Sequence, residues 1–265
     1  LVDLNCTVTL GPRYIIDSVV FPVDSTYAAL QLDQRLQRVV LREGKYYDRE
    51  RLDYERLRLS TLANKIGFAQ FGSENIYYHV DTTKGDHKID IYTQVIQPTD
   101  STYHTRYTLD SIIIYPNHAI NVDENRKLKK VDVKDKIVIY EHDHYLNHKL
   151  MDRMILQEPD KYYNKTNEQR SINRLLDLGL FKFINIENKP FGTGKEGRLV
   201  QEIYLTPEKM QNVSGEVELN NRSGNFFGTG VSVNYHHKNI FRHAERLDIS
   251  LAGQVETQFG NDMSL

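Results

Sequence analysis

The side chains best suited to chemistry are a group of acids and imidazoles near the middle of the chain: Glu141, His142, Asp143, His144 and His148. In an extended segment His142 and His144 lie on the same face, and His148 follows one helical turn after His144. Imidazoles placed in this way, with a carboxylate as a further ligand, suit a zinc ion. A polar surface connection between a strand and a helix explains the same residues, and we favour it. We therefore predict no metal and no other cofactor.

A glycine-rich run, GTGKEG from Gly192 to Gly197, is similar to a phosphate-binding loop. Such a loop needs a helix after it and a serine or threonine after the lysine. Here Glu196 follows Lys195, and the residues after the loop have the pattern of a strand, so a hairpin turn is the better interpretation. Serine, histidine and aspartate are scattered without the pattern of an activated nucleophile. We predict that the protein is not an enzyme.

The composition narrows the class of protein. The chain has 265 residues, of which 39% are hydrophobic and 26% charged, with a net charge of -2. These values exclude a disordered chain and give no electrostatic reason to bind nucleic acid. No apolar run approaches the roughly 20 residues of a membrane helix, so any contact with a membrane interior must use strands. Because the chain begins at Leu1 without a signal-peptide pattern, we expect it to be part of a longer protein.

Two stretches of the sequence occur twice. RYIIDSVVFP, from Arg13 to Pro22, resembles RYTLDSIIIYP, from Arg106 to Pro116. LREGKYYD, from Leu41 to Asp48, resembles LQEPDKYYN, from Leu156 to Asn164. The offset grows from about 93 to about 115 residues, which predicts two copies of one unit with an insertion in the second. We place this insertion near residues 117–144, with a strand at 136–140.

Each copy has the pattern strand, helix, helix, strand, strand. In the first copy we expect strands at 13–21, 73–81 and 88–97, a short helix at 30–41, and a second helix between the cap Asp48 and the stop Gly67. In the second copy Thr166 and Gln169 predict a capping box, Gly179 predicts the helix end, and strands are expected at 181–187 and 199–206. Residues 1–10 have the pattern of the closing strand of an earlier copy.

After Pro207 the pattern changes to a strict alternation of apolar and polar residues. Three segments show this alternation, most clearly at Val213 to Leu219, Val231 to Tyr235 and Leu247 to Val255. A period of two without helical spacing is typical of a membrane β-barrel, with lipid on one side and water on the other. A water-soluble antiparallel sheet with one solvated face gives the same alternation.

The order of these features resembles one family. A βααββ unit that follows Gly11-Pro12-Arg13-Tyr14 and leaves its second helix through Gly67-Phe68 is similar to a POTRA domain of the BamA/TamA superfamily. The run from Gly228 to Glu256 resembles the opening of that family's barrel, the bacterial surface antigen domain. Its Asn239-Ile240-Phe241 and Ala244-Glu245 match the family pattern, whereas His243 stands where glycine is usual. The inserted segment is most like TamA-type members.

This resemblance implies an α+β chain of tandem POTRA modules followed by the start of a transmembrane β-barrel. The implied parts are the last strand of a preceding module at 1–10, one module at 11–98, a second at 103–210, and the first antiparallel barrel strands at 211–265. The implied function is assembly or translocation of outer-membrane β-barrel proteins, with the POTRA modules in the bacterial periplasm. Expected partners are unfolded or nascent outer-membrane proteins, periplasmic or membrane partner subunits, and outer-membrane lipid.

Two other functions fit the same residues: a two-partner-type secretion pore that exports a polypeptide, and a soluble POTRA-type scaffold. In each case a three-stranded sheet leaves an edge whose free N–H and C=O groups can pair with an incoming strand. The resemblance places the second strand of each module at that edge. The candidate client-binding residues are Ile76, Tyr77, Tyr78 and His79 in the first module and Phe183, Ile184, Asn185 and Ile186 in the second.

Overall fold

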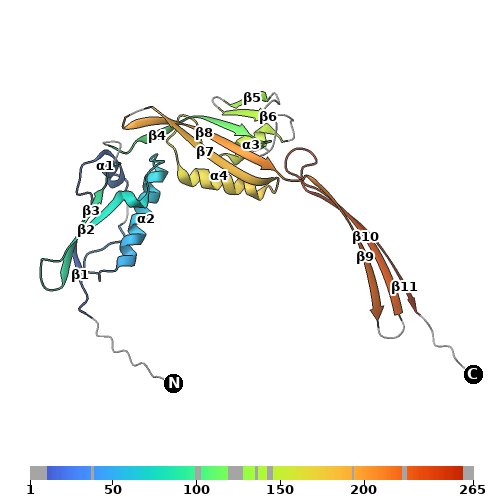
Figure 1. Cartoon of the computed structure of the whole chain (residues 1–265), viewed down its shortest axis with the longest axis horizontal. Coiled ribbons are helices and arrows are strands. Elements are labelled where there is room, and N and C mark those ends of the chain that lie inside the picture. The colour runs from blue at the N-terminus through green and yellow to red at the C-terminus, as the bar shows by residue number, and fades with distance from the viewer. Residues whose placement is uncertain are drawn as a thin grey trace, which may run out of the picture. The chain divides into compact units, whose positions relative to one another are not determined.

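A computed structural model describes residues 11–36, 39–98, 103–118, 128–134, 137–141, 146–192, 194–222 and 226–258. The fold is α+β, as predicted, and its elements are labelled in Figure 1. Within the described residues, no helix combines the length and the apolar character needed to span a membrane. The chain divides into two compact units. The first contains the described parts of Leu1–Asp110, Gln157–Asn167 and Lys189–Val200, and the second contains the other described residues.

The first set of elements follows the predicted order strand, helix, helix, strand, strand. They are β1 (Ile15–Val20), α1 (Tyr27–Asp33), α2 (Arg49–Lys65), β2 (Ile76–Asp81) and β3 (Lys88–Val95), with a short 3-10 helix, η1 (Ser73–Asn75), before β2. The sheet order is β1-β3-β2, in which β1 runs parallel to β3 and β2 runs antiparallel to it. Strand β3 is therefore central, and β2 lies at one edge.

Helix α2 begins and ends where the sequence predicts. The carboxylate of Asp48 accepts a hydrogen bond from the backbone N–H of Glu50, which satisfies one of the free amides at the helix start. Gly67 follows the helix with φ of +115°, a conformation that side chains with a Cβ rarely adopt. Leu52, Leu59 and Ala63 form the buried stripe between these two ends.

The short helix α1 differs from its prediction. It begins at Tyr27 because the hydroxyl of Thr26 caps it by accepting from the N–H of Ala29. It ends at Asp33, after which the chain continues in tighter turns, with the N–H of Leu36 bonded to the carbonyl of Asp33. The predicted helix at 30–41 was therefore wrong at both ends: the Thr26 cap starts the helix earlier, and the tighter turns after Asp33 end it earlier.

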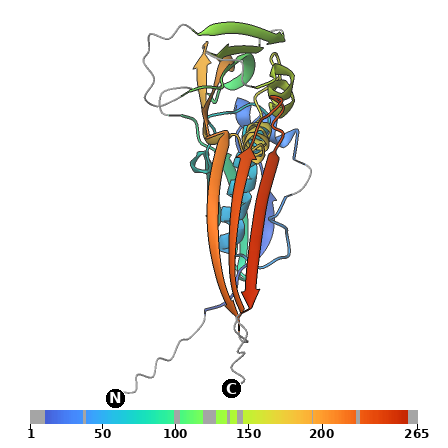
Figure 2. The same ribbon diagram turned by 90° about the vertical axis from the view of Figure 1, so that its right-hand side faces the viewer.

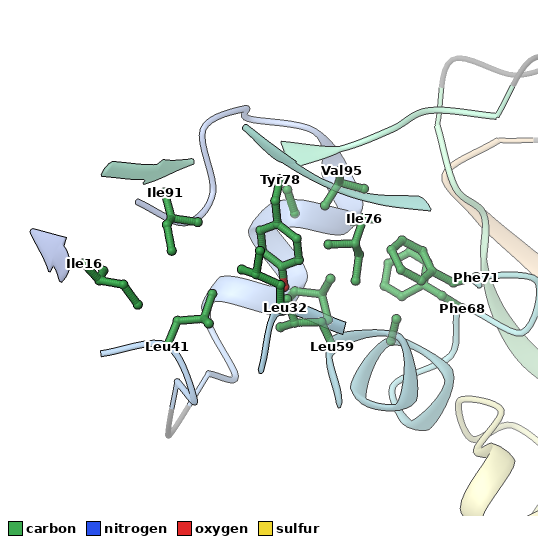
Figure 3. Close-up of a cluster of buried hydrophobic side chains, with 14 of the residues drawn as sticks. Ile16, Leu32, Leu41, Leu59, Phe68, Phe71, Ile76, Tyr78, Ile91 and Val95 are labelled. Atoms are coloured by element: carbon green, nitrogen blue, oxygen red, sulfur yellow. The ribbon is translucent and has the colours of Figure 1, made fainter. Parts of the chain in front are cut away.

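Apolar side chains from the two helices and the three strands meet in one core, of which Figure 3 shows the main members. Leu32 of α1, Leu59 of α2 and Ile91 of β3 are at most 2% exposed. Burying each such side chain stabilises the fold by about 1.5–3 kcal/mol. Tyr78 of β2 also enters this core, and its hydroxyl group has no hydrogen-bond partner among the described residues.

The second set of elements repeats the order and adds two strands. It comprises β4 (Arg106–Tyr115), β5 (Lys129–Lys134), β6 (Ile137–Glu141), α3 (His148–Met154), α4 (Lys165–Asp177), β7 (Phe181–Phe191) and β8 (Glu196–Pro207). The sheet order is β5-β6-β4-β8-β7, with β6 parallel to β4. The two additional strands fall in the expected insertion and extend the sheet beyond β4. Strand β4 is thereby interior, and its Ile112 and Ile114 are fully buried.

The predicted capping box of the second module is wrong. Helix α4 begins at Lys165, so Thr166 lies inside its first turn. The cap is instead the side chain of Asn164, whose oxygen accepts from the backbone N–H of Thr166 at 3.0 Å and of Asn167 at 3.3 Å. Asparagine caps as well as serine or threonine do, and Asn164 lies two residues before the predicted cap, Thr166.

The sequence repeat corresponds to a repeated backbone contact. In the first copy, Gly44 donates its N–H to the carbonyl of Ile16 at 2.8 Å. In the second copy, Asp160 donates to the carbonyl of Leu109 at 2.7 Å. Gly44 and Asp160 both have positive φ, of 75° and 61°. The segment before each second helix thus pairs with the first strand of its module in the same way.

The last three strands form a separate antiparallel sheet, which Figure 2 shows side by side. They are β9 (Gln211–Arg222), β10 (Phe226–His237) and β11 (Leu247–Gln258), in the order β11-β10-β9. Each has 12 residues, and the two registers run without a bulge. The three alternating segments of the sequence correspond to these strands.

Candidate functional site

Both groups of candidate residues lie on edge strands. Ile76 to His79 belong to β2, which pairs only with β3 among the described strands. Phe183 to Ile186 belong to β7, which is the last strand of its sheet next to β8. Each strand therefore has one side on which its backbone N–H and C=O groups are not used by a neighbouring strand of the same sheet.

The side chains on the β2 edge alternate between core and surface. Ile76 and Tyr78 are buried against the helices, with exposed fractions of 2% and 8%. Tyr77 is 51% exposed, and the ring of His79 lies 6.1 Å from that of Tyr92 on the neighbouring strand. Burial raises the pKa of Tyr78, so its hydroxyl stays neutral at physiological pH. Of the four candidate residues on β2, only Tyr77 and His79 have exposed side chains that can contact a molecule at the surface.

The β7 edge shows the same division. Ile184 and Ile186 pack against the buried cluster that includes Leu175 and Ile203. Phe183 is exposed, as is Asn185. The ring of Phe183 is apolar but lies on the solvent-facing side of the edge strand, so it does not contribute to the buried core and is available for a contact at the surface.

The polar residues of the possible zinc site are only partly described. Glu141 at the end of β6 is buried, and its carboxylate lies 3.0 Å from Nε2 of His148 at the start of α3. His142, Asp143 and His144 lie outside the described residues. Among the residues that are described, no group of three or more histidine, cysteine or acidic side chains could hold a metal ion.

The glycine-rich run connects two strands rather than a strand and a helix. Strand β7 ends at Phe191 and β8 begins at Glu196. Gly192 and Gly194 have φ of 84° and 124°, as a tight connection between neighbouring strands requires. A hairpin turn was expected here, and no helix N-terminus follows that could face a phosphate.

The sheet of β9, β10 and β11 has one apolar and one polar face. Cross-strand rows such as Val213–Tyr235–Ile249 bring apolar residues of all three strands to one face, although the row at the far end, Asn221–Phe227–Thr257, is mixed. The apolar face carries Val213, Val217, Leu219, Phe227, Val231, Val233, Tyr235, Ile249, Leu251 and Val255. Several of these side chains are highly exposed, including Val217 at 70% and Leu251 at 71%. Nothing in the described structure covers them.

The opposite face of this sheet is polar and partly acidic. Its rows include Ser214–Asn234–Ser250 and Glu218–Gly230–Gln254. A shallow cavity of about 300 Å³ on this face is lined by Glu216, Glu218 and Gln254, among others. The alternation in the sequence therefore corresponds to two different faces of the sheet, because a register without a bulge keeps successive residues on opposite faces.

Sequence reasoning missed one conspicuous residue, Arg106. Its guanidinium donates from Nε to the carbonyl of Ile66 at 2.7 Å and lies 3.4 Å from the ring centre of Tyr162. The repeat-related Arg13 is exposed and lies 5.5 Å from the ring centre of Tyr46. The shared Arg-Tyr pattern marked both arginines as comparable. This pattern did not indicate that Arg106, unlike Arg13, binds the carbonyl group at the end of α2.

Comparison with known proteins gives structural relatives only. No protein-family model matches the sequence, and no curated protein matches it. Among solved structures, BamA from Haemophilus ducreyi lacking POTRA domains 1–3 is similar over 91% of this chain and 43% of its own, with 11% identity and a TM-score of 0.50. CdiB from Acinetobacter baumannii is similar over 93% of this chain and 39% of its own, with 11% identity and a TM-score of 0.38.

A fragment with POTRA domains 3–5 of BamA from Haemophilus influenzae matches over 73% of this chain and 97% of its own, with 12% identity and a TM-score of 0.28. The chain thus spans about two fifths of the length of the first two structures. At these identities the likeness to the Haemophilus ducreyi structure shows the fold alone. That fold is a POTRA-type arrangement of βααββ units followed by an antiparallel sheet.

Proposed function

We propose that this chain is part of an outer-membrane factor of the BamA/TamA type, which assembles or translocates β-barrel proteins. In this proposal the βααββ units lie in the bacterial periplasm and bind unfolded or nascent client strands. The sheet of β9, β10 and β11 is the start of a barrel in the outer membrane. The work is mechanical and needs no covalent chemistry by the protein.

The apolar face of the β9–β11 sheet is the observation that carries the proposal. Its rows run from the level of Val213 to that of Phe227, eight residues along the strands by the observed register. Eight residues of an antiparallel strand span about 27 Å, or about 20 Å at a tilt of about 40°. The apolar band of an outer-membrane barrel is about 25 Å tall, so the tilted face spans most of this band.

Lipid is also the surrounding that makes this face stable. At about 25 cal/mol per Å² of apolar surface, leaving so many valine and leucine side chains in water is costly, and a soluble monomer rarely exposes such a patch. The polar face then lines a wet interior, as Glu216 and Glu218 require. Lipid tolerates no free sheet edge, so the proposal requires further strands that pair with β9 and β11.

Client binding is the second part of the proposal, and the edges of β2 and β7 support it. Both strands offer backbone hydrogen-bonding groups along one side, and both present an exposed ring, Tyr77 or Phe183, beside them. An unfolded barrel protein is rich in segments that pair as strands, so main-chain hydrogen bonds can bind it without a fixed sequence. Membrane or periplasmic partner subunits are expected to bind free strand edges of the same kind.

Reconstitution of the full-length protein in liposomes tests this function. A purified, urea-unfolded outer-membrane barrel protein is added, and its folding is followed by its resistance to heat and protease. A photoreactive phenylalanine replaces Tyr77 or Phe183 and reports which client segments lie at each edge. The matched control carries the same group at Tyr54, which is exposed on helix α2 and not on an edge strand.

We expect faster client folding with the protein present, and cross-links from the two edge positions but not from Tyr54. Equal cross-linking from all three positions would contradict binding at the edges. Client folding that is no faster than in empty liposomes would contradict assembly. If the client instead appears free inside the vesicles, the protein exports polypeptides, which is the secretion alternative.

A further inference from the structure

A row of tyrosines crosses the second sheet on the face opposite its buried core. Tyr140 of β6 stacks on Tyr115 of β4 with ring centres 5.6 Å apart and planes at 17°. Tyr115 in turn stacks on Tyr204 of β8 at 4.9 Å and 7°. The sheet order β6-β4-β8-β7 shows that the row advances one strand at a time toward the edge strand β7. Cross-strand aromatic pairs of this kind stabilise adjacent strands.

The row ends in a groove beside β7. This groove has a volume of about 420 Å³ and is lined by His118, Phe183, Asn185, Glu187, Tyr204 and Thr206. Its floor is thus formed by the last tyrosine of the row, and its rim by the three outward side chains of the edge strand. Phe183 on that rim is 53% exposed. A volume in this range is typical of clefts that hold small organic groups.

The lining of the groove contains one acid, Glu187, and one imidazole, that of His118. Glu187 lies on its rim, and Glu202 accepts a hydrogen bond from the hydroxyl of Tyr204. Burial, the bond to Glu202 and the charge of Glu187 all raise the pKa of Tyr204, so the floor of the groove remains an uncharged phenol. A basic side chain of an occupant is therefore complementary to the groove, and an acidic one is repelled.

We propose that this groove binds one aromatic side chain of an extended client segment that adds to β7, while a lysine or arginine on the same face of that segment lies beside Glu187. The proposal rests on the function proposed above and adds side-chain selection to it. An added strand lies one step beyond β7, so an aromatic side chain on its outward face reaches the groove over Tyr204 by leaning across the outward side chains of β7. Side chains on one face recur every second residue, which places the ring and the basic group two or four residues apart.

Binding of fluorescent peptides to the full-length protein in detergent tests this selection. The first peptide alternates polar and apolar residues and has one tyrosine and one lysine on the same face. A second peptide has leucine in place of the tyrosine, and a third has glutamate in place of the lysine. We expect each change to weaken binding about two- to tenfold.

Variants of the protein locate the effect. Tyr204→Leu is expected to abolish the preference for tyrosine over leucine, and Glu187→Gln the preference for lysine over glutamate. The matched control is Tyr140→Leu, which shortens the same row at the end far from β7 and should leave both preferences intact. Circular dichroism of each variant confirms that the fold is kept.

Peptides with a methylated backbone separate this proposal from the function on which it rests. The backbone N–H groups of an extended peptide point alternately to its two sides. Methylation of the set of nitrogens that faces β7 blocks strand addition, whereas methylation of the set that faces away leaves the pairing side intact. If only one set abolishes binding but all three peptides bind equally well, strand addition stands and the groove proposal is wrong. The groove proposal is also wrong if Tyr140→Leu acts as Tyr204→Leu does. If neither set matters, the proposed client binding itself fails.

Discussion

Replacing Arg106 by alanine should destabilise the first compact unit, to which all of its contacts belong. The guanidinium donates to the carbonyl of Ile66 at 2.7 Å, the last residue before Gly67, and lies 3.4 Å from the ring centre of Tyr162. A hydrogen bond from a charged donor contributes about 1.5–3 kcal/mol, and a cation–π contact about 0.5–2 kcal/mol. Because the two contacts share one group, we expect a loss of about 2–4 kcal/mol rather than their full sum.

Arg13→Ala is the matched control, because Arg13 occupies the same place in the repeat. Arg13 is exposed, and its guanidinium lies 5.5 Å from the ring centre of Tyr46. We expect this substitution to cost less than about 1 kcal/mol.

Hydrogen exchange measured by mass spectrometry on the full-length protein compares the two variants. The informative amide is that of Tyr107, which donates to the carbonyl of Gly67 at 2.8 Å. In Arg106→Ala this amide should exchange faster by a factor that corresponds to the lost free energy, about 30- to 1,000-fold. Equal protection in the two alanine variants would refute the assignment of Arg106 as the cap of α2.

Three further predictions concern stability. Gly67→Ala should cost more than about 1 kcal/mol in urea unfolding, because φ is +115° and a Cβ would lie 2.8 Å from a side-chain carbon of the packed arginine. Gln201→Leu should cost about 1–3 kcal/mol, since the buried amide bridges α4 and β7 through hydrogen bonds of 3.1 and 3.0 Å. Hydrogen bonds from Lys84 lower the pKa of Asp17, and those from Ser18 and Lys84 lower the pKa of Asp90. An acid whose pKa is lowered in the fold stabilises the protein at pH values above its ordinary pKa of about 4, and this stabilisation is lost as the pH falls below that value. Lys84→Met should therefore flatten the pH dependence of the urea midpoint in that range.

Features decided within a few residues could be predicted from the sequence. The Asp48 cap and the Gly67 stop define α2 locally, and both were correct. The alternation after Pro207 fixed the two faces of the last sheet because a strand has a period of two and the register has no bulge. The repeated Arg-Tyr segments also predicted the common strand order.

Features that depend on distant contacts could not be predicted in this way. Strand β5 is lysine-rich and its apolar alternation is limited to Val131 and Val133, too short a pattern to predict a strand, which the structure shows paired with β6. The burial of Arg106 depends on the end of α2, 40 residues earlier in the chain. The tyrosine row joins Tyr115, Tyr140 and Tyr204, whose spacing along the sequence has no regular pattern. Only the order of the strands brings these residues together.

The lipid contact of the β9–β11 sheet is the central claim, and spin labels on its two faces test it most directly. Val217 lies on the apolar face and Glu218 on the polar face, one residue apart on β9. A nitroxide is attached to Val217→Cys or Glu218→Cys in full-length protein that carries Cys6→Ser and resides in outer-membrane lipid vesicles. Relaxation by oxygen, which concentrates in lipid, is compared with relaxation by a water-soluble nickel complex.

We predict that the label at 217 is reached by oxygen and shielded from nickel, and that the label at 218 shows the reverse. If the label at 217 is reached mainly by nickel, or by neither reagent, the apolar face meets water or a protein core. Either result would contradict a membrane role for this sheet.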